Sequence, residues 1–145
     1  MIGLLQRVAE ARVEVELRSI ADIKTGLLVF IGIEKDDNHS NADRLLHKLL
    51  GYRIFPDTDG KMNLSLKDIH GGLLLVPQFT LPADTRKGMR PSFSTAAPTD
   101  TGRELFNYLL SQARQNYASV EAGMFGADMK VHLVNEGPVT FWIQV

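Results

Sequence analysis

The sequence predicts an α+β fold, in which a curved, largely antiparallel, barrel-like sheet is covered by two main helices. Segments with the two-residue period of strands predominate, and only two segments carry an apolar stripe of helical spacing. Helices packed on a sheet are a common layered arrangement. The chain has 145 residues, a length typical of one domain with a proper core. Residues 1–145 are therefore expected to form a single domain.

The first part of the chain is expected to consist of strands. Residues 1–9, 12–17 and 20–24 are predicted as strands with short breaks between them, because apolar and polar residues alternate, most clearly at 13–17. Residues 26–33 form a continuous apolar run. Such a run predicts a strand that is buried on both faces.

A helix is expected next, followed by shorter elements. Its apolar stripe has helical spacing and consists of Ala42, Leu45, Leu46, Leu49 and Leu50. Asn38, Ser40 or Asn41 would cap its N-terminus. After a turn at 57–60, strands are expected at 61–65 and 73–79, and a loop at 82–91.

The second helix is expected after Pro98. Thr101 and Glu104 have the spacing of a capping box, and Thr99 is an alternative cap. The buried stripe of this helix consists of Leu105, Phe106, Leu109, Leu110 and Ala113.

Two strands, near 129–134 and at 139–145, are expected to end the fold. The Gly137-Pro138 step just before the last strand predicts a turn with stiff backbone carbonyls. Only an X-Pro peptide bond can be cis at modest cost, so this turn is a candidate for one. An ordinary hairpin turn is the alternative.

Composition excludes several classes of protein. There is no cysteine, and therefore no disulfide framework or cysteine-bound metal. No segment approaches the length of a membrane span, and the short apolar N-terminus does not resemble a signal peptide. We therefore expect a cytoplasmic protein with no membrane contact.

Charge and motifs narrow the chemistry. The net charge of −1 gives no sign of duplex binding. Arg86, Lys87 and Arg90 form a local basic cluster, which would either meet a few phosphates or lie in a solvated loop. The four histidines lack metal-binding spacing, and no nucleophile elbow or phosphate-binding loop is present. No metal and no cofactor is expected.

Three segments carry a resemblance to a known family. They are Gln78-Phe79-Thr80-Leu81, Gly88-Met89-Arg90-Pro91-Ser92-Phe93, and the ending in which Asn135 precedes Gly137-Pro138-Val139-Thr140. Together they resemble the D-aminoacyl-tRNA deacylases. The resemblance covers the whole chain, including Gln6-Arg7-Val8 and Ala127-Asp128-Met129. One position departs from the pattern, because the family usually has serine where this chain has Pro77.

The resemblance implies the fold of that family, hydrolysis of D-aminoacyl-tRNA held by its 3′ end, and a homodimer with its active sites at the subunit interface. In the family, a cis Gly-Pro enters the partner subunit's pocket and excludes L-aminoacyl groups. Gly137 and Pro138 are assigned this role, and Arg7 is assigned to hold them. Such a filter cannot reject glycine, so activity on glycyl-tRNA is also expected.

Gln78, Phe79 and Thr80 are the candidate catalytic residues, at the end of a buried strand. Thr80 is the obvious side-chain nucleophile, but no base lies near it in the sequence. An aminoacyl ester is reactive enough that the N–H groups of Phe79 and Thr80 could stabilise the oxyanion while the 2′-hydroxyl of the RNA activates water. Whether Thr80 attacks or only positions the substrate stays open.

Phe79, Phe125 and Met129 are candidates for the walls of a pocket for the terminal adenosine, since aromatic rings stack on bases. Plain core packing is the alternative for them. A non-catalytic RNA- or protein-binding module on the same scaffold is the alternative function, and Pro77 is the feature that favours it. A small-molecule D-amino-acid hydrolase is a weaker third hypothesis, because no catalytic triad or metal site is visible.

Overall fold

The computed structural model describes residues 1–145. Its main sheet has six strands in the order β2-β1-β3-β6-β7, with β8 paired to β1. β1 is antiparallel to β2, β3 and β8, whereas β6 is parallel to both β3 and β7. The strands are β1 (Ile2–Val15), β2 (Arg18–Ile23), β3 (Gly26–Gly32), β6 (Gly72–Pro77), β7 (Val120–Ala122) and β8 (Lys130–Gln144).

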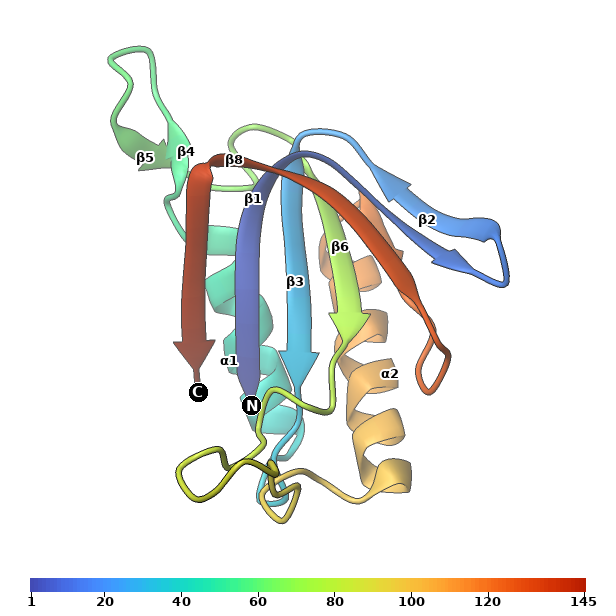
Figure 1. Ribbon diagram of the computed structural model, residues 1–145. Helices are drawn as coiled ribbons and strands as arrows, with labels where there is room; N and C mark the ends of the chain where they lie inside the picture. The colour runs from blue at the N-terminus through green and yellow to red at the C-terminus, as the bar shows by residue number, and fades with distance from the viewer.

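Two long strands, β1 and β8, bend together and give the sheet its barrel-like curve (Figure 1). The first half of β1 pairs with β3, and its second half pairs with β2. β8 runs beside both halves, with register irregularities on either side of Val8. We expected two separate strands in each of these places. That prediction was wrong because both strands continue through the bend.

The sheet is covered on one face and partly covered on the other, and β3 is buried on both of its faces. α1 (His39–Gly51) and α2 (Thr99–Asn116) cover one face (Figure 1), where Leu27, Val29 and Ile31 of β3 join the larger core. The bent halves of β1 and β8, together with β2, cover part of the other face, where Leu28 belongs to a smaller core. This smaller core consists of Val8, Ala11, Val13, Ala21, Ile23, Leu28, Leu74 and Val76. The prediction of a strand buried on both faces, and of an α+β fold with a curved sheet and two helices, is confirmed.

The two helices begin differently. Asn38 caps α1, because its side chain accepts a hydrogen bond from the Ser40 N–H at 2.9 Å and its own N–H donates to Asn41 Oδ1 at 3.2 Å. Pro98 occupies the cap position of α2 and provides no side-chain bond. Thr99 therefore already lies inside the helix, so both threonine caps that we predicted are wrong. Neither helix is long and apolar enough to cross a lipid bilayer.

A small hairpin of β4 (Phe55–Pro56) and β5 (Met62–Leu64) protrudes beyond the end of the main sheet (Figure 1). The Asp57 carboxylate organises its turn by accepting hydrogen bonds from the Asp59 N–H (2.9 Å), the Lys61 N–H (2.9 Å) and Asn63 Nδ2 (2.7 Å). At the other end of the sheet, the chain from Gln78 to Pro98 forms long loops (Figure 1). This loop region contains the candidate site.

Candidate active site

A cavity of about 800 Å³ lies where β6 ends and α2 begins. Four of the predicted site residues line it, namely Gln78, Phe79, Phe125 and Met129. The structure thus brings together residues that lie some fifty positions apart in the sequence. We call this space the aromatic cavity; its other lining residues are Ile31, Ile33, Val76, Pro77, Phe93, Ser94, Ala96, Ala97, Pro98, Thr99, Gly102, Gly126, Ala127 and Val131. None of its lining side chains is ionisable.

Aromatic and sulfur-containing side chains form the walls of the aromatic cavity. Phe79 is 65% exposed, and its ring centroid lies 5.5 Å from that of Phe93, so Phe79 is not simply packed in the core. Phe125 is half-buried, and its ring lies 6.2 Å from that of Phe106 in the core. The Met129 sulfur accepts a hydrogen bond from the Met124 N–H at 3.3 Å, which fixes this side chain at the wall.

The segment from Gln78 to Thr80 continues β6 past its last residue. The Gln78 N–H donates to the Ile31 carbonyl at 2.8 Å, so the segment stays attached to β3. The N–H groups of Phe79 and Thr80 donate no hydrogen bond within the chain. The Gln78 side-chain amide donates to Thr80 Oγ1 at 2.5 Å. Two adjacent backbone donors therefore remain free beside Gln78 and Phe79, which line the aromatic cavity.

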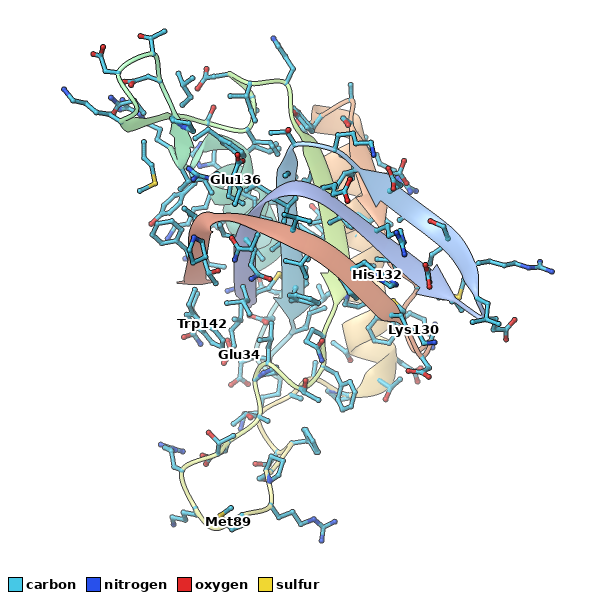
Figure 2. The ribbon with its side chains drawn as sticks, turned by 45° about the horizontal axis from the view of Figure 1, so that its top comes forward. Glu34, Met89, Lys130, His132, Glu136 and Trp142 are labelled. Carbon is cyan, nitrogen blue, oxygen red and sulfur yellow. The ribbon has the colours of Figure 1, made fainter.

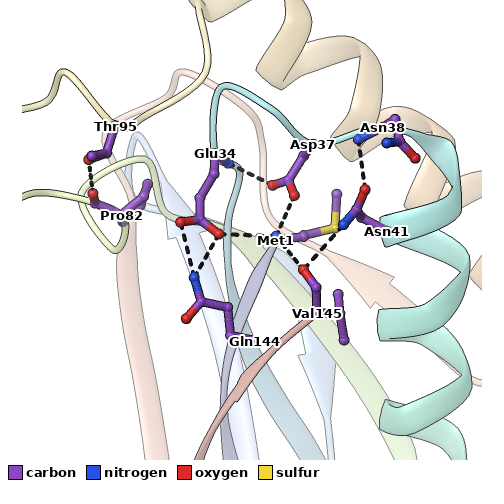
Figure 3. A network of polar contacts seen from close by, with 9 residues as sticks. All are labelled: Met1, Glu34, Asp37, Asn38, Asn41, Pro82, Thr95, Gln144 and Val145. Carbon is purple, nitrogen blue, oxygen red and sulfur yellow. Dashed lines mark hydrogen bonds and ion pairs between the residues drawn. The ribbon is translucent and has the colours of Figure 1, made fainter.

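Thr80 faces a second cavity, of about 650 Å³, on the open face of the sheet beside Leu4, Phe30 and Trp142. Glu34 is the ionisable residue that lines this cavity. Its carboxylate accepts hydrogen bonds from Gln144 at 2.9 and 3.0 Å and pairs with the Met1 ammonium at 3.2 Å (Figure 3). No base contacts the Thr80 hydroxyl, so the structure offers no partner that would activate it as a nucleophile.

Gly137 and Pro138 lie inside β8, where the pairing of this strand with β1 is interrupted between Asn135 and Thr140. Both residues are exposed, and the peptide bond between them is cis. The predicted turn before the last strand is therefore wrong. The strand continues because the Asn135 side chain bridges the bend, accepting from the Val139 N–H at 3.0 Å and donating to Thr140 Oγ1 at 2.9 Å.

Glycine is required at this bend, which we call the Gly-Pro bend (residues 136–139). The φ of Gly137 is +126°, a value that residues with a Cβ rarely adopt. A Cβ added there would lie 2.7 Å from Val139 Cγ2 and 3.1 Å from Arg7 Nη2. Any other residue would therefore have to displace the bend or the arginine that supports it.

Arg7, in the neighbouring strand β1, holds the Gly-Pro bend through a hydrogen bond. It is half-buried, and its Nε donates to the Glu136 carbonyl at 3.1 Å while its Nη1 donates to the Ile54 carbonyl at 2.9 Å. The guanidinium thus ties the bend to the base of the β4–β5 hairpin. Arg7 is therefore anchored by two backbone carbonyls.

Within one chain, the Gly-Pro bend and the aromatic cavity lie apart. Arg7 is level with Leu27 of β3 and Leu73 of β6, whereas Gln78 follows Pro77 at the far end of β6. Five residues of strand separate the two levels, roughly 17 Å along the sheet. In Figure 2, Glu136 lies at the opposite end of the molecule from the loop that carries Met89. The structure therefore does not bring Gly137 and Pro138 to the cavity of their own chain.

Only part of the basic cluster of Arg86, Lys87 and Arg90 is free to bind phosphates. Arg86 is paired with Asp84, its Nη2 lying 2.8 Å from Asp84 Oδ2, and this hydrogen-bonded pairing holds the pKa of Asp84 well below its usual range. Lys87 and Arg90 are exposed beside the fully exposed Met89 (Figure 2). Two of the three predicted charges are therefore unpaired.

Sequence reasoning missed three residues that shape these sites. Phe93 belongs to the Gly88–Phe93 motif and Asn135 to the C-terminal motif, but neither motif predicted a role for these two residues. Gly102 gave no signal, since a glycine in a predicted helix has no distinguishing pattern; it lines the aromatic cavity at a point where an added Cβ would lie 3.4 Å from the Phe125 ring.

Comparisons with known proteins show which family the chain belongs to. The family described as D-Tyr-tRNA(Tyr) deacylase matches residues 4–144. A D-aminoacyl-tRNA deacylase from Pseudomonas putida is 65% identical over 145 residues and covers 100% of both chains. One from Pseudomonas fluorescens is 62% identical over 144 residues, covering 99% of both chains.

Two solved structures share the fold. The c-Myc DNA unwinding element binding protein superposes with a TM-score of 0.96 at 36% identity, covering 100% of this chain and 99% of that chain. A probable eukaryotic D-amino acid tRNA deacylase superposes with a TM-score of 0.85 at 18% identity, covering 99% of this chain and 98% of that chain, and shows the fold alone. The resemblance inferred from the motifs is confirmed, and the chain belongs to the D-aminoacyl-tRNA deacylase family.

Proposed function

We propose that this protein hydrolyses the ester bond of D-aminoacyl-tRNA, releasing the free D-amino acid and the tRNA, and that it acts in the cytoplasm as a single domain of residues 1–145. One observation carries the chemistry. The N–H groups of Phe79 and Thr80 are free, and Phe79 lines a cavity with aromatic walls and no ionisable lining residue. Such a site can orient an ester and stabilise an oxyanion, but it supplies no acid–base pair.

In this proposal the terminal adenosine occupies the aromatic cavity between Phe79, Phe125 and Met129, which line it. The ester carbonyl then meets the two free N–H groups. A water molecule attacks the carbonyl carbon and gives a proton to the vicinal 2′-hydroxyl of the terminal ribose, which passes its own proton to the 3′-oxygen. The oxyanion collapses as the bond from the carbonyl carbon to that 3′-oxygen breaks, which releases the D-amino acid and the tRNA with its 3′-hydroxyl. Positioning and oxyanion stabilisation carry the reaction.

Chiral selection requires a second element, since D- and L-aminoacyl esters carry the same groups. We assign it to the Gly-Pro bend of the partner subunit in a homodimer. The carbonyls of Gly137 and Pro138 would accept hydrogen bonds from the substrate ammonium, and the rigid backbone would clash with an L side chain. Glycine has no side chain to clash, so glycyl-tRNA would also be hydrolysed.

Two observations support assembly in trans. The bend lies roughly 17 Å along the strands from its own chain's cavity, as estimated from the strand rise. The open face of the sheet also presents a row of apolar side chains, in which Leu4 pairs with Phe30 on one side and with Trp142 on the other. Trp142 is 51% exposed. A second copy that covered this row would exclude water from it.

The decisive test is hydrolysis of matched D- and L-aminoacyl-tRNA. We expect rapid release of the D-amino acid and little release of the L form. Equal rates on both substrates would contradict the chiral filter. No hydrolysis of either would favour a non-catalytic binding module, for which Pro77 in place of the usual serine is the motivating feature. Pro77→Ser serves as the matched variant, and it should change the rate little if the missing hydroxyl is dispensable.

A further inference from the structure

Arg103 stands out among the basic residues near the aromatic cavity. It is exposed, its guanidinium carbon lies 4.9 Å from the centroid of the Phe125 ring, and Phe125 lines the cavity. Arg103 takes part in no ion pair and no side-chain hydrogen bond within residues 1–145. Its neighbour Glu104 lies instead 3.8 Å from His39. A fully charged group with five N–H donors is therefore free at the rim of the cavity.

The position of Arg103 is fixed by rigid structure. It lies in α2, directly after Gly102, whose lack of a side chain lets the helix approach the Phe125 ring. On the other side, Arg103 Nη2 lies 3.6 Å from the point that a Cβ on Gly126 would occupy. The guanidinium is thus held between the helix, the Phe125 ring and the backbone at Gly126. Lys87 and Arg90, by contrast, lie on the long exposed loop.

We propose that Arg103 forms a phosphate subsite, which binds the phosphodiester group linking the terminal adenosine to the rest of the RNA. This inference rests on the proposed binding of that adenosine in the aromatic cavity. A nucleoside that enters the cavity leaves its 5′-phosphate at the rim, because the lining contains no charged group to receive it. A planar guanidinium can bind two phosphate oxygens at once, and it can keep its stacking on Phe125 while doing so.

A purely structural role for Arg103 has to be separated from phosphate binding. The contact with Phe125 stabilises the cavity wall whether or not a phosphate is bound. Loss of Phe125 support would weaken binding of every substrate that contains adenosine. Loss of a phosphate contact would weaken only those substrates that carry the 5′-phosphate. The two roles therefore differ in their substrate dependence.

The experiment compares D-aminoacyl-tRNA with 3′-O-D-aminoacyl-adenosine, which has no 5′-phosphate. Arg103→Gln should lower kcat/KM on the tRNA about tenfold, mainly through KM, since a hydrogen bond to a charged group is lost. The dependence of kcat/KM for the tRNA on salt concentration should also become shallower in this variant, by the amount expected for the loss of about one phosphate contact. Hydrolysis of aminoacyl-adenosine should fall far less, since that substrate loses only the effect of the guanidinium contact with the Phe125 ring. Arg103→Lys should recover part of the loss, because it restores the charge without the bidentate geometry.

Arg114→Gln is the matched control, because Arg114 is an exposed basic residue in the last turn of the same helix. It should leave both substrates unaffected. Inhibition provides a second readout: wild type should bind adenosine 5′-monophosphate more tightly than adenosine, and Arg103→Gln should remove the difference. Equal losses on both substrates, or no loss on the tRNA, would overturn the phosphate subsite. A wild type that hydrolyses neither substrate would instead overturn the proposed function on which the subsite rests.

Discussion

At the scale of single residues, Thr80 separates two mechanisms. Its hydroxyl accepts a hydrogen bond from Gln78 and contacts no base. We therefore expect Thr80→Ala to keep substantial activity, with a far smaller loss than the ~100–1,000-fold caused by removal of an oxyanion donor. The rate of D-aminoacyl-tRNA hydrolysis measures this directly. Trapping of an acyl group on Thr80 would contradict the prediction, as would unchanged hydrolysis of 3′-acylated tRNA ending in 2′-deoxyadenosine.

Gly137 allows a second test at this scale. Because its φ is +126° and an added Cβ would lie 2.7 Å from Val139 Cγ2, Gly137→Ala should destabilise the fold by about 1–3 kcal/mol. It should also weaken discrimination against L-aminoacyl-tRNA more than it lowers the rate on the D form. Denaturant unfolding and paired D/L assays measure the two effects.

Gly51→Ala is the control for this substitution. An added Cβ at Gly51, the last residue of α1, meets nothing within 4 Å. The change should be neutral or slightly stabilising, because alanine favours a helix over glycine by up to ~1 kcal/mol. If Gly137→Ala were equally neutral and kept the D/L ratio, the Gly-Pro bend would not be the chiral filter.

Residue roles were predictable only in part. The motifs identified the segment 78–80 and the Gly137-Pro138 step, since these residue types are specific in combination. The bonds that hold the bend were not predictable. Arg7 reaches a carbonyl 47 positions away at Ile54, and Asn135 acts through bonds to Val139 and Thr140 that no periodicity records.

At the scale of elements, the apolar patterns located the helices and most strands, but not their continuity. β1 and β8 each change their burial pattern where they bend, so one strand looked like two. β7 has only three residues, Val120–Ala122, too few to show a period of two. The start of α2 after Pro98 was predicted correctly, but its lack of a side-chain cap was not, because Thr99 and Thr101 were both plausible caps.

The β4–β5 hairpin provides a pH prediction for an element. Hydrogen bonds from the Asn63 side chain first, and from the Lys61 N–H second, lower the pKa of Asp57 below its ordinary value of 3.8. The folded hairpin thus favours the ionised form. Its stabilisation is complete above the unfolded pKa and is lost as pH falls through the lower folded value.

Hydrogen exchange of the Asp59 and Lys61 amides, followed downward from neutral pH, measures this loss. Protection should hold down to about pH 4, near the ordinary Asp pKa, and then decline. Asp57→Ala should abolish the protection at every pH. Asp59→Ala is the control, since no hydrogen bond of the Asp59 carboxylate is present. A decline that Asp57→Ala leaves unchanged would show that another group controls the hairpin.

At the scale of the whole molecule, one rigid sheet carries the candidate catalytic segment (residues 78–80) at one end and the Gly-Pro bend at the other. The length and composition indicated a globular chain, yet nothing in the pattern of residues showed that these two parts would lie far apart. Only the register of β1, β3 and β6 shows it. A two-fold axis that crosses the sheet between the two levels would exchange them, and would place each bend near the other subunit's cavity.

Subunit mixing tests this arrangement. One variant, Gly102→Leu, fills the aromatic cavity, because Gly102 lines it and a leucine side chain would extend toward Phe125. The other replaces both Gly137 and Pro138 with alanine and leaves the cavity intact. Each homodimer lacks one half of every composite site and should be inactive. A mixed dimer combines the intact cavity of one subunit with the intact bend of the other.

Random pairing at equal amounts makes half of the dimers mixed, and each of these has one complete site of two. About a quarter of wild-type activity should therefore return after subunit exchange, given unbiased two-fold pairing. Mass measurement of the exchanged dimers shows whether mixing has occurred, and D-aminoacyl-tRNA hydrolysis measures the recovery. If the dimers mix and no activity returns, the bend does not act across the interface. Gly137 and Pro138 would then have to reach a substrate outside the aromatic cavity, because the register of the sheet keeps them away from the cavity of their own chain.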